Sequence, residues 1–378
     1  MPEDAVESAT PLHGASTAPL DGSEAVAASQ HDDEEMPRVT LTRRRTIAFV
    51  AFVLLSIALL YVVLPQIGSV KEAWGRVTDG DRAWLAGALV FQLLAIGSYV
   101  ALFHGINVPR GSPLTHRDSY LITMAGLAAT RLFAAAGAGG VALTAWALRR
   151  SGMERREVAE RMIAFLVLLY GVYMLTMLVC GVGLRIGLFP GRAPFAMTVV
   201  PAIVSAVAMA LVLPLALVPE DFPRRIERMA ARRPRTARLL RRLALGPASM
   251  RGGIRLAMRK VAHPDRALVG AVTWWAFNVA ILWASFHAFG EPPPLAVLVQ
   301  AFFVGMLANL LPLPGGIGGV DGGMIGALVA FGVDAGVAVL AVLSYRLFAF
   351  WLPTLPGVIA YFQLRRRVQQ WRHEPAPA

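Results

Sequence analysis

The sequence predicts an all-helical polytopic membrane protein, and three observations support this class. Hydrophobic residues make up 56% of the 378 residues, and charged residues only 16%. Apolar runs long enough to cross a hydrocarbon core of roughly 30 Å recur along the chain. Arginine clusters separate these runs, as is typical of loops on the cytoplasmic side of a membrane. The architecture that fits is about six full spans plus two re-entrant helical hairpins in an inverted repeat.

The N-terminal residues 1–40 differ from the rest of the chain in charge. Residues 1–38 carry nine acids against one base, Arg38, although the whole chain has a net charge of +12. They are rich in Ala, Ser, Asp and Glu and lack apolar periodicity, so they cannot bury enough surface to offset the entropy of ordering. We expect a disordered acidic tail without a secretory signal.

The first two apolar runs form an out-and-back pair. The first, from about Thr46 to Ile67, follows Arg43, Arg44 and Arg45, which place its start in the cytoplasm. The second, from about Ala83 to Ile106, returns the chain to the same side.

The next apolar stretch, Tyr120 to Leu148, is interrupted at its centre. It contains Arg131 and the run AAAGAGG at residues 134–140. It ends at five arginines, namely Arg149, Arg150, Arg155, Arg156 and Arg161. A single crossing would leave this cluster outside, whereas a re-entrant hairpin of two half-helices keeps it in the cytoplasm.

The middle of the chain carries the strongest orientation signal. Spans at about Met162 to Leu184 and Phe195 to Val218 lead into residues 219–266, which hold 14 bases and 4 acids. This basic region is expected to be cytoplasmic and to contact the anionic inner leaflet. Within it, Ala231 to Leu245 has two open interpretations, an interfacial amphipathic helix or a solvated loop. Nucleic-acid binding is not expected.

The last third of the chain contains a second broken stretch. A span at about Ala267 to Phe289 leads to an apolar segment from Leu295 to about Val333, interrupted by LANLLPLPGGIGGVDGG at Leu307 to Gly323. The last span, about Gly336 to Phe362, ends at Arg365, Arg366 and Arg367. We therefore expect a membrane domain at 41–365, a cytoplasmic tail at 366–378, and both termini in the cytoplasm.

The two broken segments are similar in sequence. Leu127-Ala128 followed by GAGGV at 137–141 corresponds to Leu307-Ala308 followed by GIGGV at 316–320, an offset of about 180 residues with one gap. The deduced topology inverts one copy relative to the other. Paired Gly/Pro-interrupted segments in two inverted halves indicate a binding site near the bilayer midplane.

Three motifs in the second half carry a family resemblance. They are PLPGGIGGVDGG at 312–323, GALVAFGV at 326–333 and SYRLFAFWLPTLPG at 344–357. With them, roughly residues 45–365 resemble the transmembrane lysylphosphatidylglycerol synthase region, or flippase-like domain family, in a stand-alone form. The resemblance implies translocation of a polar-headgroup lipid, typically an aminoacylated phospholipid, from the inner to the outer leaflet. Only two of the 36 bases are lysine, which suggests a bacterial genome, so the expected location is a bacterial cytoplasmic membrane. The resemblance maps the family's acid and arginine onto Asp321 and Arg346. The first half departs from the pattern, because alanines stand where the second half has prolines.

Charged residues at membrane depth are the strongest candidates for a lipid-headgroup site. They are Arg131, Asp321 and Arg346, since a guanidinium can bind a phosphate through two hydrogen bonds. An alternative is that Asp321 and Arg346 only neutralise each other, and Asp321 also suits a helix N-cap. Gly318 and Gly319 precede a half-helix whose first N–H groups favour anions.

Weaker candidates surround this group. Asn309 and Tyr345 could line the same cavity, together with Asn278 and Gln300, but hydrogen bonds between helices are the favoured explanation for each of them. The histidines His104 and His287 lie near span ends without metal-ligand spacing, and the single cysteine, Cys180, suits a core position. No metal or other cofactor is expected.

A second class of function remains open, a membrane-embedded transferase acting on a lipid-linked donor. Its support is Asp79-Gly80-Asp81, an acidic triple able to hold a divalent cation. Asp81 also stands where the N-cap of the following span belongs, so a structural role is favoured and no enzyme is expected. The chain has no Walker A loop. The lipid, the energy source and the oligomeric state, including a homo-oligomer, are left undetermined.

Overall fold

All secondary structure that the structure describes is helical. The computed structural model describes residues 80–109, 111–112, 114–132, 138–217, 237–310, 316 and 318–371. Five of its helices are long and apolar enough to cross a membrane, and shorter apolar helices accompany them. The chain is thus a polytopic membrane protein. The expected first span at 46–67 and the acidic tail at 1–40 lie outside the described residues.

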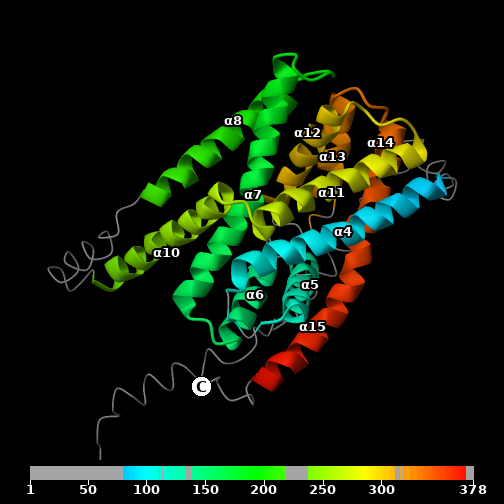
Figure 1. Cartoon of the computed structure of the whole chain (residues 1–378). Coiled ribbons are helices and arrows are strands. Elements are labelled where there is room, and N and C mark those ends of the chain that lie inside the picture. Colours follow the sequence, from blue (N-terminus) through cyan, green and yellow to red (C-terminus); the bar gives the residue numbers. More distant parts are fainter. Residues whose placement is uncertain are drawn as a thin grey trace, which may run out of the picture. The chain divides into compact units, whose positions relative to one another are not determined.

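The bounds of the helices follow the apolar pattern of the sequence (Figure 1). They are α4 Arg82–Asn107, α5 His116–Leu132, α6 Ala138–Arg150, α7 Arg155–Arg185, α8 Phe195–Val212, η3 Leu213–Leu217, α10 Ala237–Ala262, α11 Arg266–Phe289, α12 Leu295–Met306, η4 Leu307–Leu310, α13 Gly319–Ala330, α14 Ala335–Arg346, η6 Leu347–Trp351 and α15 Leu352–Trp371. The predicted spans that fall on described residues, from about Ala83 onward, are found, and some are longer than predicted. Helix α7 begins seven residues before Met162, and α15 continues past the expected boundary at residue 365.

Helices α4 and α11 pack against each other extensively as an antiparallel pair (Figure 1). Each begins at an aspartate N-cap, because Asp81 accepts a hydrogen bond from the Ala83 N–H at 2.8 Å and Asp265 accepts one from the Ala267 N–H at 2.9 Å. Glycine permits the close approach of their backbones. A Cβ on Gly270 would lie 2.6 Å from the Ser98 carbonyl oxygen of α4.

Two pairs of short helices correspond to the two broken segments. In the first pair, α5 meets α6 where Gly126 faces Thr144, and a Cβ on Gly126 would lie 3.1 Å from Thr144 Oγ1. In the second pair, α12 meets α13 where Gly305 faces Gly323. A Cβ on Gly323 would lie 3.2 Å from the Gly305 Cα. Both positions of the second crossing lie 179 residues after their counterparts in the first.

The ends of the helices gather into two groups. In the first group, the end of α4 meets the start of α5 through His104 Nδ1 and Ser119 Oγ at 2.9 Å, and the start of α7 meets the end of α4 through Arg161, which donates to the Ile106 carbonyl. In the second group, the start of α4 meets the end of α11, because the Asp81 N–H donates to the Ala288 carbonyl at 3.1 Å. The two outer ends of each pair of short helices are joined by short connections to the neighbouring helices.

Helix α15 lies along α5 in antiparallel register (Figure 1). At the start of α15, Arg131 of α5 contacts Phe350 and Thr354. Further along, a Cβ on Gly357 would lie 2.8 Å from the Met124 carbonyl oxygen. At its far end, Arg367 pairs with Asp118, close to the start of α5.

The basic region between α8 and α11 contains a helix. The described part of the amphipathic stretch is helical, in α10 from Ala237 to Ala262, whereas residues 231–236 lie outside the described residues and the interfacial position stays a prediction. It packs on the start of α7, because Gly253 leaves room for a backbone approach in which a Cβ would lie 2.6 Å from the Glu160 carbonyl oxygen. Arg255 donates to the Ala216 carbonyl at 2.9 Å, which connects α10 to the end of the preceding span.

Candidate functional site

The three charged residues predicted at membrane depth lie together around one aromatic ring. The guanidinium carbons of Arg131 and Arg346 lie 5.2 Å and 5.0 Å from the centre of the Phe350 ring. Asp321 forms an ion pair with Arg346 through Oδ1 and Nε. The group joins the end of α5, the start of α13 and the end of α14, so it assembles both broken segments.

The position of Arg131 follows from a proline in the neighbouring helix. In a regular α-helix the N–H of residue 353 would bond to the Ala349 carbonyl, but Pro353 has no N–H. Arg131 donates in its place, from Nη2 to the Ala349 carbonyl at 2.9 Å and from Nη1 to the Phe350 carbonyl at 2.8 Å. The backbone there widens into the π-helical turn Leu347–Trp351. Arg131 therefore replaces the donor that Pro353 removes at the Ala349 carbonyl, and it adds a donor at the Phe350 carbonyl, which also accepts from Thr354 Oγ1 at 2.6 Å.

A second proline has the same consequence in a different span. Pro201 of α8 cannot donate to the Met197 carbonyl, which instead accepts a hydrogen bond from Gln300 Nε2 at 2.9 Å. Gln300 lies fully buried on α12. Gln300 therefore forms a hydrogen bond between helices, which is the favoured interpretation of this residue, and its side chain carries no charge.

The ion pair is built into the turn that precedes α13. Asp321 accepts a second hydrogen bond, from the Gly318 N–H to Oδ2 at 2.9 Å, and Arg346 Nη2 donates to the Gly316 carbonyl at 3.1 Å. Both Asp321 and Arg346 are largely covered, with side-chain exposures of 19% and 12%. The pairing that the sequence left as an alternative is therefore present.

One expectation about Asp321 needs correction. The N-cap of α13 is Gly318, and Asp321 stands at the third helical position, from which it reaches back to the N-cap N–H. This is the acidic half of a capping box, in which the carboxylate satisfies an N–H left free by the helix start. The physical role is the expected one, but the helix begins earlier, at Gly319.

Glycine is required in this turn for two different reasons. Gly316 and Gly318 have φ angles of +65° and +78°, in the left-handed region that L side chains disfavour. In addition, a Cβ on Gly316 would lie 2.5 Å from Asn309 Oδ1. Asn309 is exposed and touches the turn by this approach, while its amide donates to Met306 Sδ at 3.3 Å.

Tyr345 lies next to the charged group but points into the helix packing. It is 3% exposed, its hydroxyl donates to Asn278 Oδ1 at 3.4 Å, and its ring meets Phe302 edge-on at 5.6 Å. The hydrogen bond joins α14 to α11. Tyr345 therefore has the helix–helix role that was the alternative to a cavity position.

Among the described residues, those that could have supported metal chemistry have other partners. Asp81 caps α4, and Gly80 beside it is covered by the Phe289 ring, 2.6 Å from where a Cβ would stand. Asp79 lies outside the described residues. His104 bonds Ser119, and His287 stacks on Trp84 with ring centres 4.2 Å apart. Over the described ranges, no group of three or more His, Cys, Asp or Glu side chains is placed to hold a metal ion.

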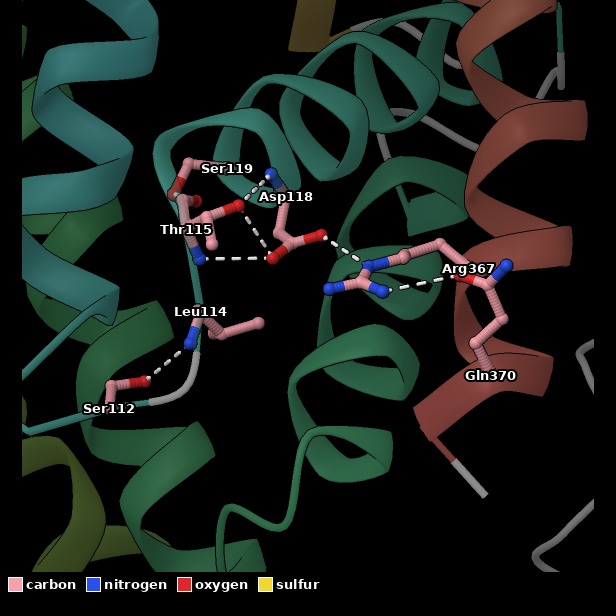
Figure 2. Close-up of polar contacts among 7 residues, drawn as sticks. All are labelled: Ser112, Leu114, Thr115, Asp118, Ser119, Arg367 and Gln370. Carbon is pink, nitrogen blue, oxygen red and sulfur yellow. Dashed lines mark hydrogen bonds and ion pairs between the residues drawn. The ribbon is translucent and has the colours of Figure 1, made fainter. Parts of the chain in front are cut away.

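A second polar cluster was not anticipated from the sequence (Figure 2). Asp118, only 1% exposed, accepts from the Thr115 N–H at 2.9 Å, from Thr115 Oγ1 at 2.8 Å and from Arg367 Nε at 3.2 Å. The spacing Thr-x-x-Asp is a capping-box signal, and it would have placed the start of α5 at His116 instead of near Tyr120. Nothing in the sequence indicates that Arg367 is the partner.

Comparisons with known proteins agree with this membrane architecture. A family model described as the lysylphosphatidylglycerol synthase TM region matches residues 47–357. Two proteins of Methanothermobacter thermautotrophicus, each described as a UPF0104 membrane protein, are 37% and 36% identical over 87 residues, which is 23% of this chain in both cases. The matched segments span 25% and 26% of those relatives.

Proposed function

Since this chain belongs to the lysylphosphatidylglycerol synthase transmembrane-region family, whose model covers residues 47–357, we propose that it translocates a phospholipid between bilayer leaflets. The polar headgroup would pass the charged group between the two broken segments while the acyl chains stay in the bilayer. The proposal extends to aminoacylated phospholipids, whose phosphate offers the same chemistry.

The architecture that we propose for phospholipid translocation is two re-entrant hairpins in an inverted repeat. Two equivalent helix crossings support it, Gly126 with Thr144 and Gly305 with Gly323. Each residue of the second crossing lies 179 residues after its counterpart in the first. So does the antiparallel pairing of α4 with α11, which precede the two hairpins. Such paired interrupted helices place a substrate site at the interface of the halves. The first group of helix ends adjoins the arginine-rich segments, which favours a cytoplasmic location for that side.

The observation that carries the proposal is an excess of positive charge around Phe350. Two guanidinium groups lie about its ring, and among the described residues Asp321 is the acid that pairs with either of them. Filling the backbone gap at Pro353 does not require a cation, because Gln300 fills the equivalent gap at Pro201 with a neutral amide. A charge in a membrane-spanning region is costly, so its presence favours a function that uses it.

The chemistry that fits this charge is that of a phosphate. Arg346 is already committed to Asp321 and Gly316, while the second cation, Arg131, lies across the ring. A phosphodiester brings one negative charge, which would balance the pair of arginines and the single carboxylate. The N-terminal N–H groups of α13 add donors for the same anion. Guanidinium groups suit phosphate because they donate two parallel hydrogen bonds.

The basic helix α10 supports the orientation of the substrate membrane. Its exposed residues include Arg255 and Arg259 next to apolar Met258. A helix of this kind suits the surface of an anionic inner leaflet. We propose that it rests there at the cytoplasmic side.

The test is the charge-removing variant Arg131→Gln in proteoliposomes. Fluorescent phosphatidylglycerol, phosphatidylethanolamine and an aminoacylated phosphatidylglycerol are each reconstituted, and exposure on the far leaflet is followed by quenching. Glutamine keeps an uncharged N–H donor on the same helix face, so we expect the protein to stay folded while translocation falls about tenfold or more. Cys180→Ser, remote from the charged group, is the matched control. Equal rates for Arg131→Gln and the wild type would exclude the charged group as the headgroup site.

A further inference from the structure

The cluster around Asp118 joins α5 and α15, which meet at their other end through Arg131 and Thr354 and between these two points through apolar and backbone packing. The carboxylate of Asp118 lies near the start of α5, and Arg367 comes from the last turns of α15 (Figure 2). Between this cluster and Arg131, the described contact of the two helices is made by small or apolar residues, such as Gly357 against Ala128. The ion pair therefore closes one end of the α5–α15 interface, and the charged group around Phe350 lies at the other end.

Helix α15 has a natural pivot beside the charged group. The π-helical turn Leu347–Trp351 precedes it, and Pro353 and Pro356 each remove a backbone hydrogen bond within its first turns. Arg131 holds this pivot by its bonds to the Ala349 and Phe350 carbonyls. Motion of α15 about the pivot would displace Arg367 most and the charged group least.

Asp118 has two separable roles at this end. Its Oδ2 accepts both bonds from Thr115 and caps α5, whereas its Oδ1 faces Arg367. The cap alone needs no partner on α15. Burial of the carboxylate to 1% exposure makes the opposite charge of Arg367 important, because a buried carboxylate without a partner is strongly unfavourable.

We infer that the Asp118–Arg367 ion pair is a latch, which holds α15 against α5 and must open to admit a headgroup to the charged group from the side where α15 ends. This inference rests on the proposed function, because it assigns the latch to the same lipid path. Leu121 and Leu364 each lie three residues from the ion pair toward the middle of their helix, on the same helical face, and are 3% and 0% exposed. We expect opening of the latch to uncover them.

The experiment measures opening directly and does not depend on transport. In a Cys180→Ser background of the full chain, Leu364→Cys reports on the α15 side of the interface, and Leu340→Cys on α14, also buried, is the matched reporter away from it. Proteoliposomes are treated with a small water-soluble maleimide that is admitted to both faces. The labelling rate of each cysteine is compared with and without a latch substitution.

The latch substitutions are chosen to preserve the fold. Asp118→Asn keeps an oxygen for the Thr115 cap and removes only the charge that faces Arg367. It should speed labelling of Leu364→Cys roughly tenfold, and Arg367→Gln should do the same. Arg367→Lys retains a cation and should stay within about twofold of the parent rate. Glu160→Gln, which breaks the exposed pair with Arg156 within α7, should have no effect.

Two results would overturn the latch. The first is an unchanged labelling rate for Leu364→Cys in the Asp118→Asn variant. The second is an equal acceleration of Leu340→Cys, which would mean general loosening of the fold. Failure of the proposed function is a different result, namely no translocation of any tested phospholipid by the wild-type protein, and it leaves the labelling measurement intact.

Discussion

The two proline-containing spans, α8 and the α14–α15 helix, solve the same backbone problem with different chemistry. Pro201 and Pro353 each leave a carbonyl four residues earlier without its helical partner. Gln300 supplies a neutral donor to Met197 in the first case, and Arg131 supplies a cation to Ala349 in the second. We expect this difference to separate a requirement of membrane folding, which an amide meets, from a charge that folding does not need.

The largest expected effect comes from removing the cationic donor entirely. Arg131→Ala leaves the Ala349 carbonyl without its side-chain donor and takes one donor from the Phe350 carbonyl, each a loss of about 1–3 kcal/mol. We expect a clear drop in the thermal midpoint in detergent micelles together with loss of translocation. Arg131→Gln should recover most of the midpoint but not the transport. A midpoint equally low for both variants would mean that the charge itself stabilises the fold.

An intermediate effect is expected at the neutral site. Gln300→Leu removes one hydrogen bond to the Met197 carbonyl and should lower stability by about 1 kcal/mol. Translocation per folded molecule should remain near the wild-type rate, because no charge is lost. Thermal unfolding and the liposome assay on the same preparation distinguish the two quantities. If Gln300→Leu reduced translocation as much as Arg131→Gln does, the charge of Arg131 would not be what distinguishes the two sites.

The smallest effect is a coupling between the proline and its side-chain donor. Pro201→Ala restores a backbone N–H for Met197, so adding Gln300→Leu to Pro201→Ala should destabilise by less than Gln300→Leu alone, by about 0.5–1 kcal/mol. A double-mutant cycle on thermal or denaturant unfolding measures this term. Strict additivity would show that Gln300 does not compensate for the proline.

The sequence predicted the spans and the broken segments because these depend on local composition. Apolar length and arginine clusters located α4, α7, α8 and α11 to within a few residues, apart from the longer start of α7. The charged candidates were also predicted, since ionisable residues in apolar surroundings are rare. The convergence of Arg131 and Arg346 on Phe350 depends on how separate helices pack, and the segments alone do not contain that information.

Other contacts were missed for identifiable reasons. Arg367 was interpreted only as part of a basic end, and its pairing with Asp118 requires the antiparallel register of α5 and α15. The role of Arg131 as a donor to backbone carbonyls requires the geometry of Pro353 relative to a helix more than 200 residues away. Local patterns can indicate that a carbonyl is freed by proline, but the donor that fills it comes from tertiary structure.

The π-helical turn Leu347–Trp351 also sets the phase of the last helix. One residue more than a regular turn rotates everything that follows by about 100° around the helix axis. Tyr345 before the turn thus faces α11, whereas Gly357 and Arg367 after it face α5. One continuous span thus contacts α11 before the turn and α5 after it, on different sides of the helix. Deletion of one residue from the turn would rotate the contact surface of α15 away from α5.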